Sequence, residues 1–215
     1  YQDTGTDEVP LAAAFASMYQ MEHHVGRVTR GDFEFERERI LGAMDQPSVD
    51  GVNTYFVSKA AASAGLKVSL SGLGGDELFA GYPSFQQVPQ IARLFGFAKH
   101  VPAFGQAFRR VTNPLFSLFN SPKYASALEY GGSLVEAYFL RRVLYLPWEL
   151  DDLLDQQNLK EGLERLDTID TLARSVSGVS NDRDAISILE SSFYMRSQLL
   201  RDSDWAGKAH SLEIR

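Results

Sequence analysis

The feature that most limits the fold of this chain is a short alternating apolar segment that runs directly into a glycine-rich turn. Leu66, Val68 and Leu70 are separated by single polar residues, which predicts a β-strand. Residues 71–77 then read Ser-Gly-Leu-Gly-Gly-Asp-Glu. A helical pattern covers residues 53–65, just before the strand. Strands that alternate with helices predict βαβ units and a parallel sheet, which is an α/β fold.

The rest of the chain has two parts of different character. Residues 1–84 mix helical and strand patterns and residues 85–215 are mainly helical, so we expect one α/β domain with a large helical C-terminal half. The helix before the strand carries a narrow small-residue face suited to close packing, made by Val57, Ala60, Ala61 and Ala64. The other expected elements are a helix over Leu11–Tyr19, a strand over Glu22–Thr29, a helix over Asp32–Met44, and a long helix over Asp184–Leu200 with Ile186, Leu189, Phe193 and Leu200 on one side.

The composition limits the partners and the compartment. The 215 residues carry a formal net charge of −7 and a sequence pI near 5.1, which gives no basic surface for nucleic acid. There is no cysteine, which excludes disulfides and cysteine metal sites and is typical of a reducing compartment. No apolar run approaches the ~18 residues of a membrane span, and no secretory leader opens the chain. We therefore expect a cytoplasmic protein that binds neither nucleic acid nor membrane.

The glycine-rich turn is the first candidate for a binding site, because open α/β sheets bind ligands at the carboxyl ends of their strands. Gly72, Gly74 and Gly75 allow left-handed backbone angles and a close approach of the main chain to a ligand. The free amides of a helix that starts at Asp76 or Glu77 are then available to a phosphate. The alternative is structural: Asp76 caps the helix and the glycines make a tight turn. The spacing fits neither the dinucleotide fingerprint nor the Walker loop, so the turn alone leaves both interpretations open.

Four blocks of sequence together resemble the asparagine synthetase family. Residues 71–82, Ser-Gly-Leu-Gly-Gly-Asp-Glu-Leu-Phe-Ala-Gly-Tyr, are similar to the second nucleotide loop of that family. The other blocks are the Asp-Gln-Pro of residues 45–47 with the helix and strand that follow, the terminal stretch 199–215, and Asp7-Glu8 followed by a helix and Glu22-His23-His24. The blocks keep the family's order and spacing over nearly the whole chain.

The resemblance implies an adenine-nucleotide α-hydrolase-like fold, the ATP pyrophosphatase fold, and an ATP-dependent ligase. In the family a substrate carboxylate attacks the α-phosphate of ATP, pyrophosphate leaves, and ammonia displaces AMP from the acyl-adenylate. Asp76 is then expected to hold Mg²⁺, because a hard cation prefers carboxylate oxygen, and to act in catalysis with support from Glu77. The resemblance further implies that the backbone of Ser71, Gly72, Gly74 and Gly75 binds ATP and that Asp45 and Asp50 line the pocket of the carboxylate substrate. The structural interpretation of these two aspartates is turn formation around Pro47.

Two features depart from the family's pattern. The family's pyrophosphate loop, Ser-Gly-Gly-x-Asp-Ser, is expected upstream of Tyr1, and its lysine-bearing segment beyond Arg215. The glutaminase domain that supplies ammonia from glutamine is absent from this span, so we expect the span alone not to turn over ATP. Leu73 stands where asparagine-forming members carry an acidic residue, and leucine cannot act as a base. This favours a small-molecule carboxylate other than aspartate; a degenerate nucleotide-binding domain and an intramolecular, β-lactam-forming ligase are the alternatives, and a homodimer stays open.

Other polar and aromatic residues receive structural interpretations. The basic pairs at 109–110 and 141–142 are expected to be solvated. Trp205 and His210 are expected to be packed rather than catalytic. His23 and His24 are adjacent, so on a strand they point to opposite faces and cannot share a metal ion.

Overall fold

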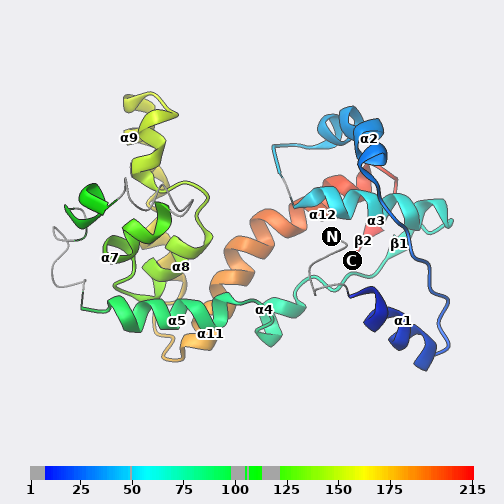
Figure 1. The fold of residues 1–215 in the computed structure, drawn as a ribbon, viewed down its shortest axis with the longest axis horizontal. Helices are drawn as coiled ribbons and strands as arrows, with labels where there is room; N and C mark the ends of the chain where they lie inside the picture. The colour runs from blue at the N-terminus through cyan, green and yellow to red at the C-terminus, as the bar shows by residue number, and fades with distance from the viewer. Residues whose placement is uncertain (1–7, 49, 98–104, 106, 113–121) are drawn as a thin grey trace. The chain divides into compact units, whose positions relative to one another are not determined.

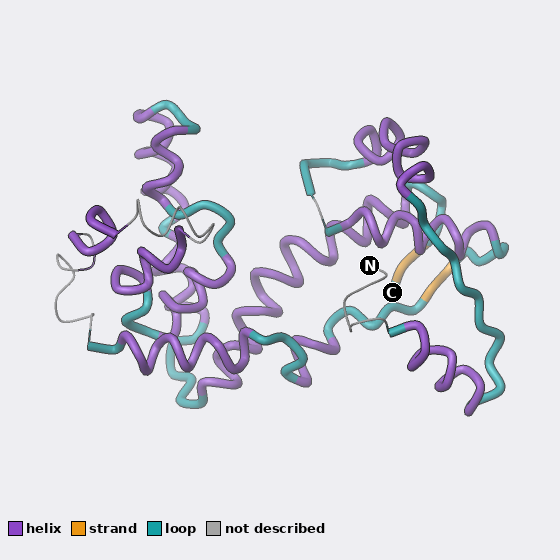
Figure 2. The backbone as a smooth tube through the Cα atoms, in the orientation of Figure 1, coloured by secondary structure: helices purple, strands orange, loops and turns teal. Residues whose placement is uncertain are grey.

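The computed structural model describes residues 8–48, 50–97, 105, 107–112 and 122–215 (Figure 1). The chain forms two compact units: unit 1 comprises residues 1–71 and 199–215, and unit 2 comprises residues 72–198. Most of the described residues are helical, as the tube in Figure 2 shows, and two strands form a small parallel sheet. Within the described ranges, no helix is both long and apolar enough to cross a membrane.

Unit 1 contains the small parallel sheet, formed by segments far apart in the sequence. Strand β1 (Val68–Ser69) pairs residue for residue with β2 (Glu213–Ile214). The pairing continues beyond the strands, since Arg215 N donates to Ser69 O at 2.9 Å and Ser71 N donates to Arg215 O at 2.6 Å. The helices of this unit are α1 (Val9–Met18), α2 (Arg30–Ala43), α3 (Gly51–Ser63) and α12 (Leu200–Lys208).

The core of unit 1 forms where α3 and α2 pack against α12. Ile40, Tyr55, Trp205 and Ala206 are buried together, which confirms the expected burial of Trp205. The start of α3 lies very close to the indole: a Cβ on Gly51 would stand 2.4 Å from Trp205 Cζ2. Glycine at this position therefore allows the close approach of the two helices.

Unit 2 is helical throughout its secondary structure in the described residues. Helix α8 (Leu134–Arg142) is central, because Ala137, Tyr138, Phe139 and Leu140 are all buried and cover more than one face of the helix. It packs against α5 (Ser84–Phe95), α7 (Ala127–Tyr130) and α10 (Thr168–Ser175). The other elements are α4 (Gly75–Phe79), α9 (Gln156–Leu166), α11 (Asp182–Leu189), the 3₁₀ turns η2 (Pro122–Ser126) and η3 (Pro147–Asp152), and the π-helical segment η4 (Glu190–Leu199), which begins in this unit.

The two N-terminal helices are confirmed and the strand expected between them is wrong. Helix α2 begins at Arg30 because Thr29 and Asp32 form a capping box, in which Asp32 N donates to Thr29 Oγ1 at 3.2 Å and Thr29 N donates to Asp32 Oδ2 at 2.8 Å. The stretch Glu22–Thr29 contains no strand, and all of its residues are exposed. A strand is not stable without a neighbouring strand, and the described residues provide none for this stretch.

Two further expectations about packing need correction. The small-residue face predicted on α3 is not the buried one, since Val57 is 67% exposed and the buried positions are Gly51, Tyr55 and Ser58. The aromatic ring of Tyr55 buries more apolar area than the alanines and therefore decides which face turns inward. The strand predicted over residues 66–70 is confirmed only over β1, and its apolar side chains are exposed.

The long C-terminal helix is present but is not a single α-helix. Helix α11 ends at Leu189, η4 continues with π geometry, and α12 follows from Leu200. The two compact units divide the chain at residues 71 and 199, because the C-terminal stretch pairs with β1.

Candidate functional site

The glycine-rich turn follows Ser71 and leads into helix α4. Gly74 has a φ of +92°, in the left-handed region, and Gly75 N donates to Gly72 O at 3.1 Å, which closes the turn. Helix α4 starts at Gly75, so the expected start at Asp76 or Glu77 is one or two residues late. Gly74 is the N-cap and offers no side chain to accept a hydrogen bond from the first helical amides.

The protein's own conformation explains glycine at only one of the three positions in this turn. Gly74 needs glycine because of its positive φ. Gly72 and Gly75 have no such requirement, and a Cβ built on either would meet no described atom within 4 Å. The space beside both α-carbons is therefore open, as it is beside Gly162, and a ligand can approach the main chain of the turn there.

The two acidic residues of α4 differ sharply in their surroundings. Asp76 is exposed, and among the described residues its carboxylate has no hydrogen-bond or ion-pair partner. It lies against the backbone of Gly81, where a Cβ would stand 1.9 Å from Asp76 Oδ1. Glu77 is 1% exposed; the Tyr82 hydroxyl donates to its Oε1 at 3.0 Å, and its Oε2 is buried without a described partner. Asp76 is thus available to a cation in solution, and Glu77 is held inside unit 2.

Helix α11 and segment η4 support the other side of the turn. The Ser187 hydroxyl donates to the main-chain oxygen of Glu77 at 2.7 Å. Met195, within η4, lies near the turn, because a Cβ on Gly74 would be 3.6 Å from its sulfur. Stretches of π-helix are rare and occur often at functional sites. The loop with Asp76 therefore rests on an irregular part of the helical scaffold.

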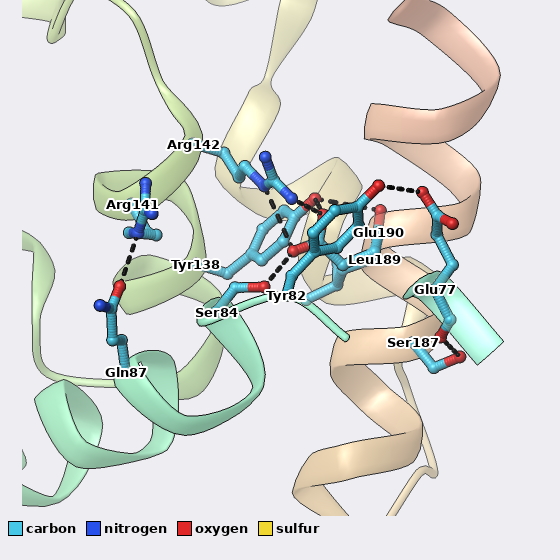
Figure 3. A network of polar contacts seen from close by, with 10 residues as sticks. All are labelled: Glu77, Tyr82, Ser84, Gln87, Tyr138, Arg141, Arg142, Ser187, Leu189 and Glu190. Atoms are coloured by element: carbon cyan, nitrogen blue, oxygen red, sulfur yellow. Dashed lines mark hydrogen bonds and ion pairs between the residues drawn. The ribbon is translucent and has the colours of Figure 1, made fainter. Parts of the chain in front are cut away.

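A buried polar network lies next to α4 in unit 2 (Figure 3). Its centre is Glu190, which has no exposed surface. The Arg142 guanidinium donates to Glu190 through Nη2 at 2.7 Å and through Nε at 3.2 Å. The hydroxyls of Ser84 and Tyr138 also donate to the Glu190 carboxylate. Four donors thus satisfy a carboxylate that would otherwise be very costly to bury.

The same guanidinium contacts two tyrosine rings. Arg142 Cζ lies 3.8 Å from the centroid of the Tyr194 ring and 5.0 Å from that of Tyr82. Burial opposes the charge of Arg142, but the hydrogen bond and the charge of Glu190 outweigh it and raise the pKa of Arg142. Burial, and after it the hydrogen bond to Glu77, raise the pKa of Tyr82 far above its ordinary value. The Tyr82 hydroxyl therefore stays a donor to Glu77 across the physiological pH range.

The remaining candidate residues belong to unit 1. Asp45 and Asp50 are both exposed, and Asp45 Oδ1 lies 3.7 Å from Arg201 Nε. Near them Asp202 is buried and accepts hydrogen bonds from the Ser48 hydroxyl at 2.6 Å and from Trp205 Nε1 at 3.1 Å. This ties the loop before α3 to α12.

The comparison with known protein families shows which family this chain belongs to. The model of the family described as "Asparagine synthase" matches residues 1–215, the whole chain. The chain belongs to the asparagine synthase family. Curated relatives assigned as glutamine-hydrolysing asparagine synthetases occur in Mycobacterium bovis (strain ATCC BAA-935 / AF2122/97) and in Mycobacterium tuberculosis (strains CDC 1551 / Oshkosh and ATCC 25618 / H37Rv).

The similarity to each of these relatives is limited in extent. In each case 31% of 99 aligned residues are identical, which covers 45% of this chain and 15% of the relative. The chain therefore aligns with only a small part of the curated proteins it matches. No solved structure gives a significant match.

The residues that pack around the glycine-rich turn were not identified from the sequence. Arg142 is not a solvated surface residue, since it pairs with the fully buried Glu190; Arg109 likewise pairs with Glu129 at 2.7 Å. A signal for Glu190 exists, because it lies at helical spacing from Ile186 and Phe193, on the apolar side of the helix. A carboxylate on such a face predicts a buried partner, and the sequence does not say which arginine provides it.

Proposed function

We propose that this chain is part of an ATP-dependent, amide-forming ligase with the ATP pyrophosphatase fold. In the proposed reaction a carboxylate oxygen of the substrate attacks the α-phosphorus of ATP, and the bond to the β-phosphate oxygen breaks with release of pyrophosphate. The nitrogen of ammonia then attacks the acyl carbon and loses a proton, while the bond to the AMP oxygen breaks. Membership of the asparagine synthase family and the open glycine turn together support this proposal.

The observation that carries the proposal is the open space beside Gly72 and Gly75. Neither residue needs glycine for its φ or for packing among the described atoms. A nucleotide can approach the main chain of the turn at these two positions, because no side chain occupies the space beside them. We therefore assign ATP binding to Ser71, Gly72, Gly74 and Gly75.

Asp76 suits a magnesium ion held partly by the nucleotide. Magnesium is commonly bound by one or two carboxylates together with substrate phosphates and water. The described residues contain no group of three or more His, Cys, Asp or Glu side chains arranged for a metal ion, but the exposed, unpartnered Asp76 offers one carboxylate of the kind required. When bound, magnesium would neutralise the charge that develops on pyrophosphate as it leaves. We assign to Glu77 the support of this helix from within.

The acid substrate is the least constrained part of the proposal. Leu73, which is 37% exposed, carries no group that could take a proton from the incoming ammonia. We therefore favour a small carboxylate other than aspartate, with Asp45 and Asp50 at the substrate pocket. The ammonia would come from glutamine, hydrolysed by a separate glutaminase domain. The curated relatives are assigned as glutamine-hydrolysing, which supports this nitrogen source.

The test measures ATP binding by calorimetry and pyrophosphate release by the full-length protein with a panel of carboxylates. Asp76→Asn is expected to lower pyrophosphate release at least tenfold, since a lost hydrogen bond or contact to a charged group costs about 1.5–3 kcal/mol. The control Asp170→Asn makes the same change at an exposed residue of α10 and is expected to change the rate less than twofold. ATP binding without pyrophosphate release for any acid would favour a degenerate nucleotide-binding domain. No ATP binding would refute the assignment of the turn.

A further inference from the structure

We propose that Arg142 is a positioning residue of the nucleotide turn, which it holds in place through the ring of Tyr82 and the carboxylate of Glu77. The inference deepens the proposed function and rests on it where turnover is concerned. Its structural part concerns only the order of α4 and can be tested whether or not the protein turns over ATP.

The first step is the anchoring of Arg142 itself. Arg142 lies in the last turn of α8, the central helix of unit 2, and contacts Glu190 with two of its nitrogens. Glu190 is in turn held by Ser84 and Tyr138 (Figure 3). A planar guanidinium bound at two points to a carboxylate has a defined orientation, unlike an ammonium group on a flexible chain. The plane of Arg142 is therefore set by the core.

The second step is the contact between the Arg142 guanidinium and the Tyr82 ring. The guanidinium lies over the rings of Tyr194 and Tyr82, and these two rings meet edge to face with centroids 5.8 Å apart. Cation–π and edge-to-face contacts are directional and each is worth about 0.5–2 kcal/mol. Tyr82 is thus restrained on two sides, although it lies on the short segment between α4 and α5.

The third step leads from Tyr82 to the turn. The hydroxyl of Tyr82 donates to Glu77 Oε1 at 3.0 Å, and Glu77 Oε2 is buried with no partner in the described residues. Glu77 follows Asp76 directly in a helix of five residues, too short to be stable by itself. A displaced Glu77 therefore displaces Asp76, whose carboxylate already lies in contact with Gly81.

A simpler interpretation is that Arg142 only stabilises unit 2. The chain contains a matched residue that separates the two interpretations. Arg109 also bonds a glutamate, Glu129, at 2.7 Å and also lies over an aromatic ring, with its Cζ 4.7 Å from the centroid of Trp148. Arg109 has no described contact with α4 or Tyr82. A substitution there perturbs the same kind of interaction without touching the proposed link.

The first experiment follows amide hydrogen exchange in the full-length protein and its variants Arg142→Lys, Tyr82→Phe and Arg109→Lys. Lysine keeps a charge for Glu190 but loses the flat, stacked geometry; phenylalanine removes only the hydroxyl that holds Glu77. We expect the amides of Leu78 and Gly81, which bond Gly74 O and Asp76 O, to exchange about tenfold faster in the first two variants, as the loss of a hydrogen bond to a charged group implies. Arg109→Lys should leave these amides unchanged.

Unchanged exchange of these amides in either variant would overturn the proposal, and so would an increase spread evenly over unit 2. The double variant Arg142→Gln, Glu190→Gln replaces Arg142→Lys if the latter does not fold, because it keeps a neutral polar pair in the core and removes the stacked cation.

The second experiment measures pyrophosphate release. Arg142→Lys is expected to lower kcat/KM for ATP about tenfold, because Asp76, the proposed magnesium ligand, and Glu77 are displaced from their positions beside the turn. In a Glu77→Gln background the same substitution should have no further effect on kcat/KM. An additive loss would indicate a general structural role and refute the positioning role. If the wild-type protein releases no pyrophosphate, the proposed function fails, and the exchange experiment still decides the role of Arg142.

Discussion

A single added methyl group tests the contact between Asp76 and Gly81. In Gly81→Ala the new Cβ would stand 1.9 Å from Asp76 Oδ1, 2.9 Å from its Cγ and 3.3 Å from its Cα. Gly81 does not have a positive φ, so its backbone conformation is one that alanine can also adopt. The carboxylate must therefore rotate away, and because the Cα cannot rotate, the end of α4 must shift as well.

The expected cost follows from these distances. A side chain held off its rotamer costs about 0.5–1.5 kcal/mol, and overpacking a well-filled place costs about 1–3 kcal/mol. We therefore expect Gly81→Ala to lower the free energy of unfolding by about 1–2 kcal/mol. If Asp76 holds magnesium, its displacement should also weaken the binding of Mg²⁺·ATP about tenfold, since an interaction with a charged group is worth about 1.5–3 kcal/mol.

The assay compares calorimetric titrations of ATP with and without magnesium in the full-length protein, together with urea unfolding. Gly162→Ala is the control, because Gly162 lies in α9 with no atom near its missing Cβ, and alanine there should raise stability by about 0.5–1 kcal/mol. The magnesium-dependent part of ATP binding should fall in Gly81→Ala and stay unchanged in Gly162→Ala. Wild-type Mg²⁺·ATP affinity in Gly81→Ala would refute the argument that Asp76 must stay in this place.

Three shorter predictions concern the fold. In Gly51→Ala the new Cβ would stand 2.4 Å from Trp205 Cζ2. Urea unfolding should show unit 1 destabilised by about 1–3 kcal/mol, and the higher helix propensity of alanine should offset part of this loss. Ala80→Gly should stabilise unit 2 by up to about 1 kcal/mol, because Ala80 has a φ of +63°. Unit 1 should lose thermal stability in two steps as the pH falls. The first step begins below pH 6.5, because burial lowers the pKa of His210 in the folded protein. The second step begins below pH 4.5, because the hydrogen bonds from Lys59 and Tyr55 lower the pKa of Glu36. The unfolded chain binds these protons first, so His210→Gln should remove the first loss and Glu36→Gln the second.

Local sequence patterns predict helices well where a cap or an apolar face is contained in the segment itself. Helix α2 begins where Thr29 and Asp32 bond each other, and both partners lie within one turn. The prediction for Glu22–Thr29 is wrong because a strand needs a partner from elsewhere in the chain, and Val25 and Val28 are 62% and 50% exposed. The parallel pairing of β1 with β2 joins residues far apart in sequence, which no local period can reveal.

At the candidate site, likewise, a motif within one segment can be recognised in the sequence, whereas contacts between distant segments cannot. The motif from Ser71 to Tyr82 is continuous in sequence, so roles for its glycines and acidic residues can be predicted from the sequence alone. The burial of Glu77 cannot, because it depends on Ser187 and on the orientation of Tyr82. The solvated role predicted for Arg142 is wrong for a similar reason: a basic pair is usually solvated, and its partner Glu190 lies 48 positions away.

The π-helical segment explains why a single helical period fails nearest to the proposed site. In an uninterrupted α-helix Leu200 would return to the face of Ile186, which has no exposed surface, yet Leu200 is 46% exposed. Hydrogen bonds from i to i+5 place more residues in each turn, so the α-helical period of α11 does not continue along η4. Within η4 lie Tyr194, whose ring contacts Arg142, and Met195, whose sulfur lies near Gly74. A method that assumes one period therefore misplaces these side chains, because the departure from α geometry occurs in the segment that supports the turn.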